Sequence, residues 1–143
     1  MELIIDNLKF VSDVTKCSLD GEVYFSIGET FFPMERWFDM VGFDLSNWFP
    51  DLVSFCRNHS DTCLFSFMDG PYVIKLIRKH DGDIFAVCMR DNLPVIHPTK
   101  VDLAKLIRSM IACCHKYDRF LHENGKPNQF TREIRILKSI LDT

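Results

Sequence analysis

TCLFSFMDGPYVIKLIRKHDGDIFAVCM, residues 62–89, is the stretch from which the fold can be predicted. Its first two segments show the period-two pattern of strands: Cys63, Phe65 and Phe67 share one face of the first, and Tyr72, Ile74 and Leu76 share one face of the second. Its last segment is apolar on both faces, as in a strand that lies inside a sheet. The dipeptides Asp69-Gly70 and Asp81-Gly82 separate the segments and favour tight hairpins, because glycine readily adopts a positive φ. The stretch therefore predicts an antiparallel meander of three strands, at 62–68, 72–79 and 84–89.

Two further strands are expected before this meander. Residues 3–11 and 22–28 both show the alternation of a half-buried strand, and Asp20-Gly21 is interpreted as a turn before the second of them. Pro33 ends this extended region, because proline lacks the N–H that a central strand needs. A short helical turn is expected from Met34 to Met40.

Apolar residues with helical spacing predict helices in the rest of the chain. One is expected to begin at Ser46 or Asn47, since Pro50 is tolerated only near the first turn of a helix, and to end near Asn58. Thr99–Asp102 is interpreted as a capping box that opens a second, long helix ending near Glu123. A last amphipathic helix is expected at 130–141.

The order of these elements, ββα-βββ-αα, predicts an α+β fold in which an antiparallel sheet of about five strands is covered by helices. The 143 residues are expected to form a single domain, 1–143, and 47% hydrophobic residues are sufficient for its core. The six cysteines follow no disulfide spacing, so we expect them to be reduced and buried. An acidic N-terminus and the lack of a long apolar run predict a cytoplasmic protein without export signal or transmembrane helix.

The net charge of −3 conceals a division between the two halves of the chain. Residues 1–70 hold 12 acidic and 4 basic residues, whereas residues 71–143 hold 8 acidic and 13 basic residues. This asymmetry predicts an acidic face and a basic face, provided that folding does not interleave the two halves.

The segment 29–51 combines acidic and aromatic residues. Protein interfaces are enriched in aromatic side chains, and acids at their rim steer a basic partner. Packing of a helix on the sheet is the alternative explanation for the same aromatic residues. The partner-binding residues that this segment predicts are Glu29, Glu35, Trp37, Asp39, Asp44 and Asp51.

The chain has no recognisable catalytic or phosphate-binding motif, so no enzyme activity, cofactor or metal is expected. One alternative is a small Cys/His metal-dependent enzyme or sensor, whose ligands would come from Cys56, His59, Cys63, Cys113, Cys114 and His115. Burial of these cysteines in the core is the favoured interpretation. A second alternative is a nucleic-acid-binding module that uses the basic side of the long helix, formed by Lys105, Arg108, Lys116 and Arg119. A solvated helix face is favoured there, and a nucleic-acid partner is not expected.

The stretch GETFFPMERWFD at 28–39, followed by the Trp48-Phe49 pair, the meander and a long C-terminal helix, resembles small immunity proteins of bacterial toxin systems. The contact-dependent growth inhibition type is the most similar. This resemblance implies a cytoplasmic protein that binds and blocks the toxic C-terminal domain of a cognate effector, usually a nuclease. It implies no catalytic residues.

Overall fold

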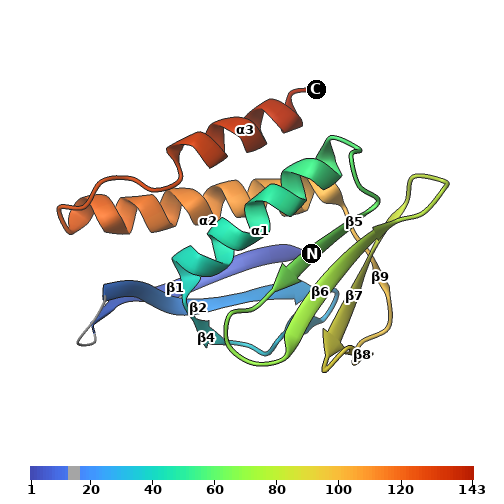
Figure 1. Ribbon diagram of the computed structural model, residues 1–143, viewed down its shortest axis with the longest axis horizontal. Helices are drawn as coiled ribbons and strands as arrows, with labels where there is room; N and C mark the ends of the chain where they lie inside the picture. The colour runs from blue at the N-terminus through green and yellow to red at the C-terminus, as the bar shows by residue number, and fades with distance from the viewer. Residues whose placement is uncertain (13–16) are drawn as a thin grey trace.

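The computed structural model describes residues 1–12 and 17–143 and confirms the α+β class (Figure 1). The strands form two antiparallel sheets where a single sheet was expected. The first sheet contains β1 (Glu2–Ser12), β2 (Cys17–Ile27), β3 (Thr30–Phe32) and β4 (Phe38–Asp39). The second contains β5 (Thr62–Ser66), β6 (Tyr72–Arg78), β7 (Ile84–Arg90), β8 (Leu93–Pro94) and β9 (Thr99–Lys100). The helices are α1 (Val41–Cys56), α2 (Leu103–Glu123) and α3 (Thr131–Leu141).

The meander is confirmed as β5–β6–β7, and the expected order of elements fits once the short strands are set aside. Alternate residues of these strands are buried, as the sequence pattern predicts: Cys63, Phe65, Ile74, Leu76, Ala86 and Cys88 face the core. In the described part of the chain, β3 and β4 extend the first sheet and β8 and β9 the second.

Asp20-Gly21 is not a turn, because both residues lie inside β2. The register of β1 against β2 shifts between Asp6 and Lys9, so β1 holds one extra residue, a β-bulge. Gly21 faces this bulge, and a Cβ atom there would lie 2.9 Å from the Asp6 carbonyl oxygen. The glycine is therefore explained by close approach of two backbones, not by a turn.

Two expectations around α1 are also wrong. No helical turn forms at 34–40, which instead contains β4, and α1 begins at Val41, five residues before Ser46. Pro50 consequently lies inside the helix, where its missing N–H leaves the Ser46 carbonyl without its usual partner. The long helix α2 ends at Glu123 as expected, but its N-cap is Asp102, whose side chain accepts from the Lys105 N–H at 3.2 Å.

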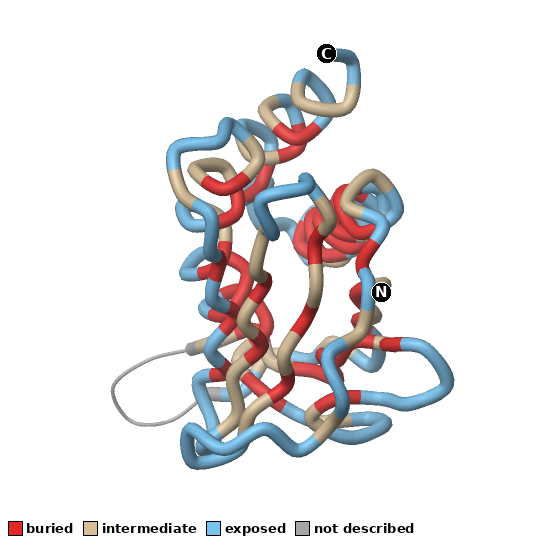
Figure 2. Tube along the Cα trace, turned by 90° about the vertical axis from the view of Figure 1, so that its right-hand side faces the viewer, coloured by how far each residue is buried: buried red, intermediate tan, exposed pale blue. Residues whose placement is uncertain are grey.

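The core lies between the two sheets and the helices (Figure 2). Its centre is aromatic: the Phe25 and Phe65 rings stack at 5.4 Å, and Trp48 of α1 lies 5.5 Å from each of them. These three side chains join α1 to both sheets and are almost completely buried. Figure 1 shows the three helices gathered on one side of the strands, with α3 outermost.

Candidate protein-binding face

The predicted partner-binding residues do not share one surface. Glu29, Glu35 and Asp51 are exposed, and Trp37 is half-buried. Asp39 and Asp44 are 3% and 0% exposed, so they lie inside the folded chain. Burial therefore removes Asp39 and Asp44 from any surface that another protein could contact.

Asp39 holds together several backbone segments. Its carboxylate accepts from the Met40 N–H at 2.7 Å, the Asp69 N–H at 3.2 Å and the Trp37 indole N–H at 3.3 Å. The Trp37 ring meets Tyr72 edge-to-face at 5.1 Å. Asp39 and Trp37 therefore tie the start of α1 to the β5–β6 turn, so their primary role is structural.

Three side chains of α1 close the free edge of β5. Asp44 accepts from the Met68 N–H at 2.8 Å, and the Trp48 indole donates to the Ser66 carbonyl at 2.7 Å. Asp51 accepts from the Leu64 N–H at 3.3 Å. Residues 44, 48 and 51 follow the i, i+4, i+7 spacing of one helix face, and the strand partners are alternate residues, which point the same way. The helix thus satisfies backbone groups that an edge strand would leave unpaired.

Burial raises the pKa of Asp44 to about 9, and the neighbouring Asp39 carboxylate adds to this shift. Oδ2 of Asp44 is buried and accepts no hydrogen bond from the described residues. If the Asp44 carboxyl group is protonated, its O–H can donate to the Asp39 side chain. This hydrogen bond also favours the neutral form of Asp44. Asp44 is therefore a neutral acid at pH 7 and contributes no charge to a binding surface.

Helix α2 closes the free edge of β1 with the same spacing. Ser109 Oγ accepts from the Leu3 N–H at 2.9 Å, and the Cys113 thiol donates to the Leu3 carbonyl at 3.4 Å. Lys116 Nζ donates to the Ile5 carbonyl at 2.8 Å. The predicted basic stripe is therefore divided. All four residues are exposed, but Lys116 and Lys105 pair with acids of β1, whereas Arg108 and Arg119 make no ion pair with the described residues.

The outer surface of the first sheet is the side turned away from the helices and the core. Val23, Phe25 and Ile27 point inward, so the alternate residue Tyr24 points outward. Register places Phe38 beside Glu22 on the same side, and the Phe31 ring meets Tyr24 edge-to-face at 5.6 Å. We call this surface the acidic aromatic face. Register and ring contact place Glu22, Tyr24, Phe31 and Phe38 on it, with Glu22 and Tyr24 only 7% and 8% exposed, and Glu35 acts on Tyr24. We include the exposed residues Glu29 and Met34 because they adjoin Phe31 in the sequence.

Large apolar side chains on this face are accessible to a partner. Phe31 is 40% exposed, Phe38 42% and Met34 49%. Burial raises the pKa of Tyr24, and the nearby carboxylates of Glu35 and Glu22 raise it further. Two cations moderate the negative field: Arg36 pairs with Glu22 at 3.1 Å, and Lys9 lies 4.9 Å from the Phe38 ring. The result is an aromatic surface with an acidic rim, a composition typical of protein interfaces.

Sequence reasoning missed Tyr24 and did not select Phe31 or Phe38, although a signal was present. In the segment EVYFSIG at 22–28, three inward-facing apolar residues leave Tyr24 on the outer side of the strand. An outward aromatic residue in a strand, followed by aromatic residues in the next segment, would have predicted an aromatic surface on the outer side of the sheet. The signal for Phe38 is weaker, because β4 has only two residues.

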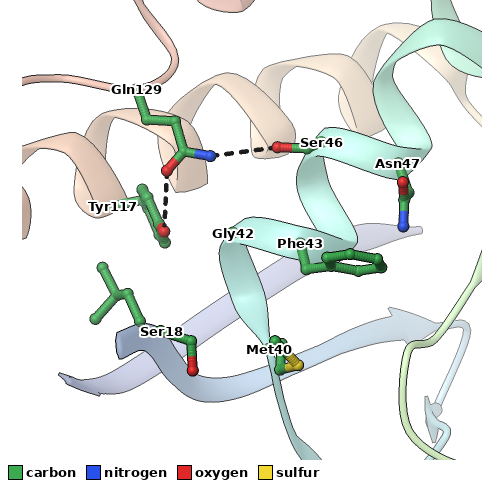
Figure 3. A pocket seen from close by; sticks show the side chains of 9 residues that line it. Ser18, Met40, Gly42, Phe43, Ser46, Asn47, Tyr117 and Gln129 are labelled. Atoms are coloured by element: carbon green, nitrogen blue, oxygen red, sulfur yellow. Dashed lines mark hydrogen bonds between the residues drawn. The ribbon is translucent and has the colours of Figure 1, made fainter. Parts of the chain in front are cut away.

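A pocket of about 440 Å³ lies where the start of α1 meets β2 and α2 (Figure 3). The Tyr117 hydroxyl donates to Gln129 Oε1 at 3.2 Å, and Gln129 Nε2 donates to Ser46 Oγ at 3.3 Å. Gly42 makes room for the Tyr117 hydroxyl, because a Cβ atom at position 42 would clash with it. Burial raises the pKa of Tyr117 to about 12, and the other lining residues carry no group that ionises near neutral pH. The pocket therefore offers hydrogen bonds but no acid–base chemistry.

The structure does not bring together the Cys and His residues of the alternative metal site. Cys63, Cys113 and Cys114 are buried, whereas His59 and His115 are exposed. Among the described residues, no three His, Cys, Asp or Glu side chains gather where they could hold a metal ion. Burial raises the pKa of Cys56 to about 11 and that of Cys113 and Cys114 to about 12. These thiols are protonated at pH 7, which makes them poor nucleophiles.

Comparison with protein families, curated proteins and solved structures found no match. The resemblance to immunity proteins therefore stays a prediction. In the described part of the chain, none of the helices is both long enough and apolar enough to cross a membrane.

Proposed function

We propose that this chain is a cytoplasmic immunity protein that binds and neutralises a cognate toxin domain through its acidic aromatic face. The observation that carries the proposal is the exposure of Phe31, Met34 and Phe38 in the segment 29–38, which also holds the exposed acids Glu29 and Glu35. Monomeric proteins seldom leave several large apolar side chains together in water unless the surface has a function.

The charge of this face favours a basic partner. A nuclease carries Lys and Arg side chains to hold phosphate groups, so an acidic inhibitor attracts it and covers the same surface that its substrate needs. Glu29 and Glu35 would speed association, while the aromatic side chains would supply the buried contacts that slow dissociation. Inhibition then needs no catalytic residue in this chain, only occlusion of the toxin.

The proposal is tested with the product of the gene directly upstream, where a toxin gene is expected. The two proteins are purified separately and mixed in a titration calorimeter at low salt. We expect a 1:1 complex that Phe38→Ser weakens by about 2 kcal/mol, as for an aromatic residue at the centre of an interface. Leu93→Ser is the matched control, because Leu93 is 68% exposed but lies on the second sheet. Lack of binding at low salt, or equal losses in both variants, would refute the proposal.

The electrostatic part of the proposal has its own measurement. Glu35→Lys should slow association about tenfold at low salt and have little effect at high salt, because screening removes long-range steering. Asp44→Asn should leave the association rate unchanged at pH 7, because the Asp44 carboxyl is already neutral there.

A further inference from the structure

The outer face of the second sheet is apolar where an exposed sheet face is normally polar. In β5, β6 and β7 the inward residues are buried, and the outward residues that alternate with them are half-buried or exposed. An antiparallel sheet with one face in water usually alternates between apolar inward and polar outward residues. Here the outward residues include Leu64, Val73, Ile77, Phe85, Val87 and Met89, which we call the apolar face.

These side chains do not belong to the core of the protein. The described helices lie on the opposite side of the strands, and none of the six is among the residues that pack against the buried cluster. Thr62 and Ser66 complete the outward side of β5, so the face is continuous across three strands. The sequence of β7 is apolar at its outward as well as its inward positions. Neither the core nor the acidic aromatic face accounts for the outward apolar residues.

Among the outward residues of β5, β6 and β7 one is charged, and it lies at the centre. At the rim, Lys100 of β9 lies beside Phe85 and pairs with Asp83 at 3.4 Å. Lys75 is the middle outward residue of β6, which is the middle of the three strands, and its register neighbours are Leu64 and Val87. Lys75 makes no ion pair with the residues that the structure describes. Covering the face would remove the ammonium group from water, which is unfavourable unless the covering surface supplies a counter-charge.

We propose that the apolar face is a second docking surface, and that its occupant is a protein surface that is apolar with a single carboxylate at its centre. Lys75 selects this occupant over a second copy of the chain. A symmetric pair of two such faces would bring two Lys75 ammonium groups together without water or counter-ion, which disfavours self-association. A partner carboxylate would instead form a hydrogen-bonded ion pair with Lys75, while the six apolar side chains would be buried around it.

The chain itself can supply a probe of this chemistry. The Lys75→Glu variant carries the same apolar face with a carboxylate at its centre, so it represents the proposed occupant. Sedimentation velocity is measured at up to about 100 μM, where an affinity of tens of micromolar is visible. We expect the unmodified chain alone and the variant alone to be monomers, and their equimolar mixture to form a 1:1 dimer at least about tenfold tighter than either self-association.

Two controls connect the result to the apolar face. Lys79→Glu makes the same charge change at an exposed position beyond the end of β6, and its mixture with the unmodified chain should remain monomeric. Val87→Lys in the unmodified chain should prevent the dimer with the Lys75→Glu variant, because it places a second cation in the face. Dimerisation of the unmodified chain alone, or a monomeric mixture of the two folded proteins, would overturn the proposal.

A second variant tests the proposal without placing a carboxylate in the apolar face. If circular dichroism shows that the Lys75→Glu variant is unfolded, Lys75→Met decides, because an uninterrupted apolar face is expected to self-associate. A Lys75→Met dimer supports the role of Lys75, and a Lys75→Met monomer overturns it. None of these measurements involves the toxin or the acidic aromatic face, so their outcome is independent of the proposed function.

Discussion

Two sheet edges in this protein are closed by helices with the same geometry but different chemistry. At β5, α1 uses the side chains of Asp44, Trp48 and Asp51, and at β1, α2 uses Ser109, Cys113 and Lys116. Both sets follow the i, i+4, i+7 spacing of a helix face. The first set includes a core side chain, Trp48, which is 1% exposed. The second set includes Lys116, whose side chain is 48% exposed.

The difference shows that one geometric solution can be stabilised in two ways. The β5 edge depends on a buried aromatic residue and on an acid that must be neutral, so its stability should vary with pH. The β1 edge depends on a hydroxyl, on a thiol whose pKa burial raises to about 12, and on a partly exposed ammonium group. Four variants test this contrast, each by urea unfolding.

Trp48→Ala should have the largest effect. It removes a core side chain and leaves a cavity between the two sheets, which typically lowers the free energy of unfolding by about 3–5 kcal/mol. Trp37→Ala is the comparison, because Trp37 is only half-buried and should lower it less. A loss below about 1 kcal/mol for Trp48→Ala would mean that the β5 edge does not depend on this residue.

Asp44→Asn should stabilise the protein at pH 8, by about 2 kcal/mol to order of magnitude. The folded-state pKa of about 9 lies above the unfolded value of 3.8, so the folded state binds the extra proton. The contribution of Asp44 to stability is therefore full below pH 4 and is lost as pH rises toward 9. Asparagine keeps the acceptor for the Met68 N–H and cannot ionise.

The measurement for Asp44→Asn is the difference in unfolding free energy from the unmodified chain between pH 5 and 8. This difference should grow with pH by up to about 1.4 kcal/mol per unit. A constant difference over that range would show that Asp44 titrates normally.

Ser109→Ala should lower the free energy of unfolding by about 1 kcal/mol, because it leaves the N–H of buried Leu3 without an acceptor. Ser139→Ala is a matched control. Ser139 makes the same hydrogen bond to the carbonyl three residues earlier in its helix, but it is exposed. Equal effects of the two changes would mean that the lost stability comes from the hydrogen bond within each helix and not from the bond to the Leu3 N–H at the β1 edge. Neither effect should vary between pH 5 and 8.

Lys116→Met should have the smallest effect, about 0.5 kcal/mol or less, because its ion pair with Asp6 is exposed to solvent. Raising the salt concentration should reduce even this difference. Lys138→Met, at an exposed position of α3 without an ion pair among the described residues, provides the baseline. A loss above about 2 kcal/mol for Lys116→Met would make the two edges equally dependent on a single residue.

The sequence was sufficient to predict elements whose signals are local. Period-two alternation and the two Asp-Gly turns identified β5, β6 and β7, and helical periodicity identified α2 and α3. The start of α1 was misplaced because Pro50 was assigned to a first turn, and Gly21 was assigned to a turn because its contact with the bulge of β1 is a tertiary one.

The candidate site could be predicted only in part. An acidic residue on a helix is expected to face water, so Asp44 and Asp51 were grouped with Glu29 and Glu35. Their partners are backbone groups of β5 and of Met68, just after it, thirteen or more residues away along the chain, and periodicity contains no information about such contacts. Glu29 and Glu35, on either side of Pro33, are exposed, and their role in binding stays a prediction.

The bulge in β1 has a consequence for how this chain tolerates insertions and deletions. Leu3 and Ile5 before the bulge, and Leu8 and Phe10 after it, all face the core only because one extra residue resets the alternation between them. Deleting either Asn7 or its neighbour would restore regular pairing and turn one pair of apolar side chains to the outside. Lineages that carry this fold should therefore keep the number of residues between Asp6 and Lys9. At position 7 they should keep a residue that tolerates a positive φ, because Asn7 has a φ of 49°.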